Sequence, residues 1–119
     1  MKTKIFCHGL LKNNNDEVLY LKRSNSKIYG GLWDLPGGKL EEHENYYSCL
    51  VREFKEETNL DIEVGQIIDV KSQIYDNCII IVLIFSVNAV NELTITLNNE
   101  HDEYTFAKSI DKDTLIWYL

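Results

Sequence analysis

An almost wholly apolar segment at residues 78–87, CIIIVLIFSV, constrains the fold of this chain more than any other feature. It is rich in β-branched residues, which is typical of a central strand buried on both faces. Such a strand needs further layers of structure to cover both sides of its sheet. The apolar stretch from Cys78 to Phe85 is too short to cross a bilayer, so we expect no membrane association.

Further strands are indicated on both sides of this segment. Periodicity and turn residues predict strands at 4–11 and 17–22, a short extended piece at 33–35, a strand at 62–75 that can break at Gly65, and short strands at 93–97 and 104–108. The turn at 12–16 is rich in Asn and Asp, which tolerate the left-handed conformation. A chain of 119 residues has room for one domain, so we assign residues 1–119 to a single α+β domain.

One strong helix is predicted at residues 45–58. Its apolar residues fall in one arc of the helical wheel and form a core-facing stripe of Tyr47, Leu50, Val51 and Phe54. Asn59 follows the helix and suits the left-handed position beyond its end. Near the end of the sequence, Asp111 is expected to cap a brief helix carrying Leu115, Ile116 and Trp117, with Trp117 packed in the core.

Charge and cysteine content exclude some classes of partner and site. The formal net charge of -7 argues against a binder of duplex nucleic acid, which would present a basic face. A nucleotide ligand remains compatible with this charge, because bound cations reverse the local field. Three widely spaced cysteines without a CxxC motif predict buried, reduced thiols and no zinc site. With no signal peptide recognised at the N-terminus, we expect a cytoplasmic protein.

The predicted helix also carries a cluster of acids. Glu53, Glu56 and Glu57 stand at i, i+3 and i+4, so their carboxylates share one face although like charges at this spacing repel. Hard oxygen ligands in a cluster suit Mg²⁺ or Mn²⁺. A solvated acidic face is the alternative interpretation of the same pattern.

The flanking residues favour a site. Gly37 and Gly38 precede the helix, and glycines let the backbone approach a ligand and turn a carbonyl toward a cation. Arg52 stands eight residues after Glu44, and an ion pair between them would pin the intervening loop to the helix.

The spacing Gly38-x5-Glu44-x7-Arg52-Glu53-Phe54-x-Glu56-Glu57-x-Asn59-Leu60 resembles the Nudix box, G-x5-E-x7-R-E-U-x-E-E-x-G-U, in which U is a bulky apolar residue. Asn59 replaces the box glycine, and Asn tolerates the left-handed conformation well. His43 replaces a glycine often seen before the first box glutamate. Residues 33–39, 21–23 and the pattern Glu100-His101-x2-Tyr104 resemble the MutT-like branch of the family.

This resemblance implies a Nudix fold, an α/β/α sandwich with a mixed β-sheet, and a metal-dependent hydrolase of nucleoside diphosphate linkages. Glu53, Glu56 and Glu57 would bind Mg²⁺ or Mn²⁺ with the carbonyl of Gly37 or Gly38. Glu53 or Glu57 would share the work of general base, and Glu44 and Arg52 would orient the site. Glu100 would be a later metal ligand or base, and Arg23 and Lys39 would contact phosphate.

Several assignments stay open at this stage. Glu100 also fits a solvated loop acid, Arg23 a solvated strand end, and Trp33 either a pocket wall or the core. The histidines His8, His43 and His101 are interpreted mainly as non-ligands.

The resemblance favours a MutT-like nucleoside triphosphate pyrophosphohydrolase. Hydrolases of ADP-ribose, nucleotide sugars or dinucleoside polyphosphates are the alternative, the last because Tyr75 lies beyond the box as a tyrosine does in those enzymes. A non-catalytic binding module is a third possibility. The protein is expected to bind a nucleotide as a monomer or homodimer.

Overall fold

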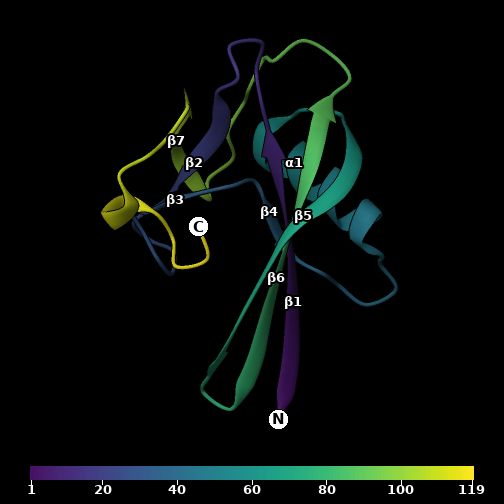
Figure 1. Cartoon of the computed structure of the whole chain (residues 1–119), viewed down its shortest axis with the longest axis vertical. Helices are drawn as coiled ribbons and strands as arrows, with labels where there is room; N and C mark the ends of the chain where they lie inside the picture. The colour runs from purple at the N-terminus through teal and green to yellow at the C-terminus, as the bar shows by residue number, and fades with distance from the viewer.

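Two β-sheets and one α-helix make up the structure, a computed structural model that describes residues 1–119 (Figure 1). In chain order the elements are β1 (Lys2–Leu11), β2 (Val18–Arg23), β3 (Trp33–Asp34), β4 (Gly37–Lys39), α1 (Tyr46–Thr58), β5 (Ile62–Tyr75), β6 (Cys78–Ala89), β7 (His101–Ala107) and a 3-10 turn at Lys112–Thr114. One sheet has the order β4-β1-β6-β5 and the other β3-β2-β7. Because β1 pairs parallel to β6 while the other pairs are antiparallel, the larger sheet is mixed, and the predicted α+β class is confirmed.

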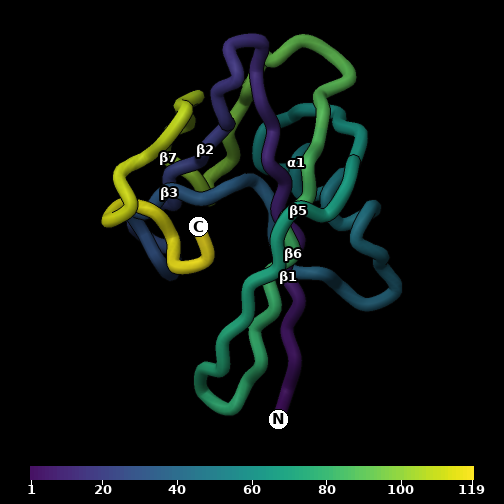
Figure 2. Tube along the Cα trace, in the orientation of Figure 1, coloured from purple at the N-terminus to yellow at the C-terminus, as the bar shows by residue number.

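The apolar strand β6 lies between β1 and β5, as its sequence predicted. One face of this sheet packs against α1, where Phe85 and Val87 join a core with Leu50 and Phe54. The other face carries Val82 and Ile84, which pack in a second core with the following residues: Val18, Leu35, Ile116 and Tyr118. The start of β1 and the hairpin that joins β5 to β6 project together away from the rest of the molecule. The N-terminus lies at the tip of this projection (Figure 2).

Helix α1 begins and ends where the sequence predicted. Asn45 caps it by accepting a hydrogen bond from the Ser48 N–H, and Asn59 adopts the left-handed conformation with φ of 62°. The buried face, however, is rotated from the predicted stripe: Tyr47 is exposed, whereas Glu53 and Glu57 are buried. The helix turns its acidic side inward because β4 presents glycines there, and a Cβ on Gly38 would lie 2.6 Å from the Glu53 carboxyl carbon.

The end of the chain differs from the prediction. Residues 93–97 form no strand, and β7 begins earlier than expected, at His101. Asp111 caps only a 3-10 turn, after which Leu115 is extended and bridges to Trp33. Ile116 and Tyr118 are buried while Trp117 between them is 37% exposed, and residues 117 and 118 form a turn closed by a hydrogen bond from the Leu119 N–H to the Ile116 carbonyl. The predicted helix and the core position of Trp117 were therefore wrong, and α1 is the one α-helix of the structure.

Other local predictions can be compared directly. Strand β5 shifts register between Val64 and Ile67, so the predicted break at Gly65 is confirmed as a bulge. Cys7, Cys49 and Cys78 are free and buried. None of the helices has the length and apolar character needed to span a membrane.

Candidate active site

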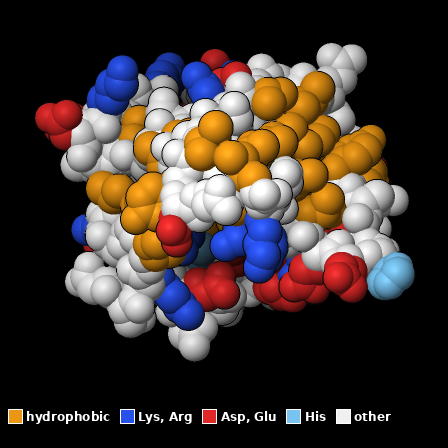
Figure 3. Space-filling view, turned by 90° about the horizontal axis from the view of Figure 1, so that it is seen from below, with side chains coloured by type: hydrophobic (Ala, Val, Ile, Leu, Met, Phe, Trp, Pro, Cys, Tyr) orange, Lys and Arg blue, Asp and Glu red, His pale blue; other side chains and the backbone are white.

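A cavity of about 800 Å³ opens between β4, α1, the start of β7 and the end of the chain. It collects most of the residues that the sequence singled out, namely Arg23, Gly37, Gly38, Lys39, Glu53, Glu57 and Glu100. In the space-filling view from below, acidic and basic side chains gather together beside a broad hydrophobic area (Figure 3). Segments far apart in the sequence thus converge on one hollow.

The three helix glutamates differ in burial. Glu57 is 2% exposed and Glu53 is 9% exposed, whereas the Glu56 side chain is half-exposed. Burial raises the pKa of Glu57 well above its ordinary value and also raises the pKa of Glu53. Two adjacent buried carboxylates of this kind would be stabilised by a cation, so the donor set fits Mg²⁺ or Mn²⁺.

The two glycines of β4 make this close packing possible. Gly37 pairs with His8 of β1 and has φ of 149°, and a Cβ there would overlap the Cys7 carbonyl oxygen. The Gly37 N–H donates a hydrogen bond to Glu57 Oε1 at 3.0 Å. The backbone before the helix is therefore fixed directly against the buried acids.

Arg52 joins the preceding loop to the helix, as the sequence predicted. Its Nε and Nη2 donate to the two Glu44 carboxylate oxygens at 2.7 and 2.9 Å, a bidentate pair. Its Nη1 donates to Glu53 Oε1 at 2.7 Å and to Glu56 Oε2 at 3.4 Å. The guanidinium holds the pKa of Glu44 down to about 2. Arg52 thus touches the loop and two of the three acids.

Glu100 lies directly before β7 and comes close to Glu57 of α1. One potential ligand atom each of Glu57, Glu100 and His101 lies within 4.8 Å of the others. The Glu100 backbone is fixed, since its carbonyl accepts from the Ser24 N–H and its N–H donates to Asn98 Oδ1. The sequence pointed to Glu100 but interpreted its neighbour His101 as a non-ligand, and the structure places both in this group.

The candidate phosphate contacts have different environments. Arg23 lines the cavity with its Nε donating to the Ile28 carbonyl, and its Nη1 lies 3.6 Å from Asp34 Oδ2. Lys39 lines the same cavity from the end of β4. Trp33 is not among the lining residues. Its ring lies 5.8 Å from the ammonium of Lys22, which likewise does not line the cavity.

A buried polar network that the sequence did not indicate forms another wall of the cavity. The Tyr118 hydroxyl donates a hydrogen bond to Asp34 Oδ1 and lies 3.3 Å from His8 Nε2. The His8 Nδ1 lies 2.8 Å from the Leu35 carbonyl oxygen. Burial raises the pKa of Tyr118 well above its ordinary value. The one sequence feature that could have indicated this network is the acidic Asp34 between the apolar residues Trp33 and Leu35.

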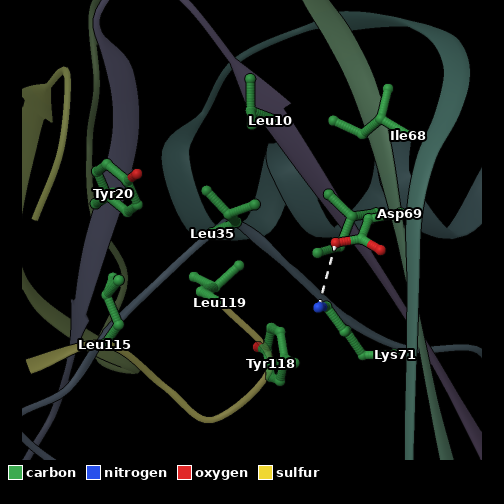
Figure 4. A pocket seen from close by; sticks show the side chains of 10 residues that line it. Leu10, Tyr20, Leu35, Ile68, Asp69, Lys71, Leu115, Tyr118 and Leu119 are labelled. Carbon is green, nitrogen blue, oxygen red and sulfur yellow. Dashed lines mark ion pairs between the residues drawn. The ribbon is translucent and has the colours of Figure 1, made fainter. Parts of the chain in front are cut away.

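Tyr118 also borders a second cavity of about 280 Å³, which is mostly apolar (Figure 4). Its polar residues are an ion pair of β5, with Lys71 Nζ 3.8 Å from Asp69 Oδ2, and both side chains are about half-exposed. This cavity lacks the converging acids and bases of the larger one. Most of the candidate catalytic and metal-binding side chains therefore line the larger cavity, which Tyr118 separates from this apolar one.

Comparison with known proteins agrees with this geometry. Residues 6–112 match the family model described as the NUDIX domain. Over 61 residues the chain is 33% identical to an 8-oxo-dGTP diphosphatase of Proteus vulgaris, a match that spans 51% of this chain and 54% of that protein. Over 50 residues it is 36% identical to a CTP pyrophosphohydrolase of Escherichia coli (strain K12), spanning 42% of this chain and 37% of the relative.

A solved structure resembles the whole fold. The MutT protein from Methanosarcina mazei Go1 superposes with a TM-score of 0.78 at 31% identity, over 89% of this chain and 77% of that chain. The curated relatives are matched over about half of their length or less, so they describe a shared region and not whole proteins. The family match extends over nearly all of the sequence, from Phe6 within β1 to Lys112 at the start of the 3-10 turn. This chain belongs to the Nudix family.

Proposed function

We propose that this protein is a divalent-metal-dependent pyrophosphohydrolase that cleaves a nucleoside triphosphate into a nucleoside monophosphate and pyrophosphate. The observation that carries the proposal is the convergence of Glu53, Glu57 and Glu100 in a cavity that also holds Arg23 and Lys39. A polyphosphate carries several negative charges, which the acids alone would repel. Cations bound by the acids would offset this repulsion, and the basic residues beside them would attract the phosphates.

The metal ligands in this proposal are Glu53, Glu56 and Glu57, with the carbonyl of Gly37 or Gly38 and with Glu100. When bound, Mg²⁺ or Mn²⁺ would neutralise charge on the phosphates and lower the pKa of a bound water. The burial of Glu53 and Glu57 supports this set, because two neighbouring buried carboxylates are costly without a compensating cation.

The other residues bind and orient. Glu53, Glu57 or Glu100 would accept the proton of the attacking water, since each carboxylate lines the cavity. Arg52 and Glu44 would hold the loop and the ligands in place through their bidentate pair. Arg23 and Lys39 would bind the phosphate chain.

Triphosphates are preferred as substrates because the relatives that this chain resembles over about half of its length include proteins described as an 8-oxo-dGTP diphosphatase and a CTP pyrophosphohydrolase. A dinucleoside polyphosphate is the second candidate, supported by Tyr75, which lines the far end of the same cavity. ADP-ribose and nucleotide sugars are further candidates. The assembly state, monomer or homodimer, and a cytoplasmic location remain predictions.

The deciding experiment is a substrate screen with Mg²⁺ or Mn²⁺. The panel should include the common nucleoside triphosphates, 8-oxo-dGTP, ADP-ribose, a nucleotide sugar and a dinucleoside polyphosphate, with the Glu57→Gln variant as control. Metal-dependent release of pyrophosphate from a triphosphate, absent in Glu57→Gln, is the expected result. Nucleotide binding without hydrolysis of any of these would instead identify a binding module.

A further inference from the structure

His101 combines burial with an unsatisfied ring nitrogen. The residue is 5% exposed, and its Nδ1 is the one buried side-chain nitrogen or oxygen atom that has no hydrogen-bond partner. Buried polar atoms nearly always have a hydrogen-bond partner, so an unpaired one indicates that a bound group completes its environment. The unprotonated nitrogen of a neutral imidazole accepts a hydrogen bond, a proton or a metal ion.

The position of His101 results from a bulge at the start of β7. Lys22 of β2 pairs with Glu103, but Arg23 pairs with His101, so Asp102 is an extra residue in β7. Bulges re-aim side chains and are common beside active sites. Here the bulge removes His101 from regular alternation with Glu103, so that His101 is buried while Asp102 and Glu103 stay exposed.

The bulge places His101 near the carboxylates of its neighbour Glu100 and of Glu57 on α1. A ring nitrogen of His101 and one oxygen each of Glu57 and Glu100 lie within 4.8 Å of one another. Glu57 is fixed by the Gly37 N–H, and Glu100 is fixed through its backbone. Three potential ligands on two fixed segments, one of them a histidine with an unsatisfied ring nitrogen, form the arrangement expected around a single ion.

We propose that His101 is a metal ligand, which together with Glu57 and Glu100 forms a mixed nitrogen and oxygen site. This inference rests on the proposed function, because Glu57 and Glu100 belong to that metal site. Imidazole suits transition metals, whereas Mg²⁺ prefers oxygen ligands and retains water. The site therefore binds Mn²⁺ more tightly, relative to Mg²⁺, than a site made only of carboxylates.

The test is a spectroscopic measurement that does not require activity. Mn²⁺ is added to the full-length protein, and pulsed electron paramagnetic resonance is used to detect coupling between the ion and nitrogen. Protein labelled with ¹⁵N-histidine assigns the coupling to a histidine. The coupling is expected in the unmodified protein, lost in His101→Gln and kept in His43→Asn, a control in the exposed loop before Glu44.

Metal titrations complete the test. His101→Gln should weaken Mn²⁺ binding by at least about tenfold and weaken Mg²⁺ binding much less, while His43→Asn should leave both unchanged. If Mn²⁺ binds, depends on Glu57 and shows no histidine coupling, His101 is not a ligand and the proposed function stands. If no divalent ion binds at all, the metal dependence of the proposed function fails as well. Should His101→Gln not fold, the labelled unmodified protein alone decides, because absence of the coupling overturns the inference.

Discussion

Tyr118 and Asp34 are joined by a hydrogen bond across 84 positions of sequence, and each side chain is at least 95% buried. Asp34 also accepts from the N–H of its neighbour Leu35 and lies 3.6 Å from Arg23 of β2, so two other segments, those of Arg23 and Tyr118, hold its carboxylate. This contact fixes the end of the chain against β3. Residues 116–118, after the 3-10 turn, consequently form a wall of the large cavity.

Removing the Tyr118 hydroxyl should destabilise the protein. Tyr118→Phe keeps the packing but deprives a buried carboxylate of a donor, which should lower the free energy of unfolding by about 1.5–3 kcal/mol. Urea unfolding measures the loss. The matched control is Tyr104→Phe, because Tyr104 is largely exposed and should change the stability by less than about 0.5 kcal/mol. Equal stability of the two variants would mean that the contact does not hold the segment.

Glu57→Gln should separate catalysis from stability. The pKa of Glu57 is raised in the folded state, so its ionisation opposes folding, and without metal this cost grows as the pH rises above the unfolded value of about 4.3. The amide removes that cost. We expect almost no hydrolysis and a melting temperature at pH 8, without metal, equal to or above that of the unmodified protein. Full activity at ordinary magnesium would contradict the role of Glu57.

Arg52→Ala should reduce both stability and rate. Arg52 contacts Glu44, Glu53 and Glu56, and loss of a charged, partly buried donor costs about 1.5–3 kcal/mol. The control is Lys55→Ala on the same helix, whose ion pair with Asp61 is half-exposed and should contribute less than about 1 kcal/mol. Urea unfolding and steady-state kinetics measure the two effects. If Arg52→Ala behaves like Lys55→Ala in both measurements, the orienting role is wrong.

The ion pair between Arg52 and Glu44 also predicts a pH dependence of stability. The folded-state pKa of Glu44 is depressed to about 2, so its contribution is complete above the unfolded pKa of about 4.3 and is lost as the pH falls toward 2. As the pH falls from 5 to 2, the free energy of unfolding should therefore drop less in Glu44→Gln than in the unmodified protein. The difference between the two drops is the contribution of the Glu44 carboxylate. Thermal unfolding in that range checks it. Parallel curves for the two proteins would exclude the contribution of Glu44.

The local pattern of the sequence was sufficient for the elements that have strong periodicity or a fixed motif. The apolar β6, the helix α1 with Asn59 at its end, and the Glu44–Arg52 pair were all predicted. Glu53 and Glu57 were recognised as a ligand face, but their burial depends on the glycines of β4, which no helical pattern contains.

Long-range contacts account for what the sequence did not reveal. The segment from Leu115 to Tyr118 was predicted as a short helix, but the bridge of Leu115 to Trp33 and the bond from Tyr118 to Asp34 hold it as a β-bridge followed by a turn. His101 was interpreted as a non-ligand because its burial comes from a bulge relative to β2, and that bulge has no local signature. The periodicity of a sequence describes one helix or strand at a time. Residues 115–118 and His101 are instead positioned by contacts between two elements, which periodicity does not describe.

The last prediction concerns Glu100, which lies 43 residues after Glu57 and yet shares a group of potential ligand atoms with it. If Glu100 accepts the proton of the attacking water, Glu100→Gln should lower kcat by about 10- to 1000-fold, the range for loss of a general base. Metal affinity should change less than in Glu57→Gln, because Glu100 is partly exposed and Glu57 is buried among the ligands. The controls are Asp102→Asn and Glu103→Gln, whose exposed side chains lie in the same segment. All three are compared with one good substrate at saturating Mg²⁺. An unchanged rate for Glu100→Gln, or a larger loss in either control, would leave proton transfer to the helix glutamates.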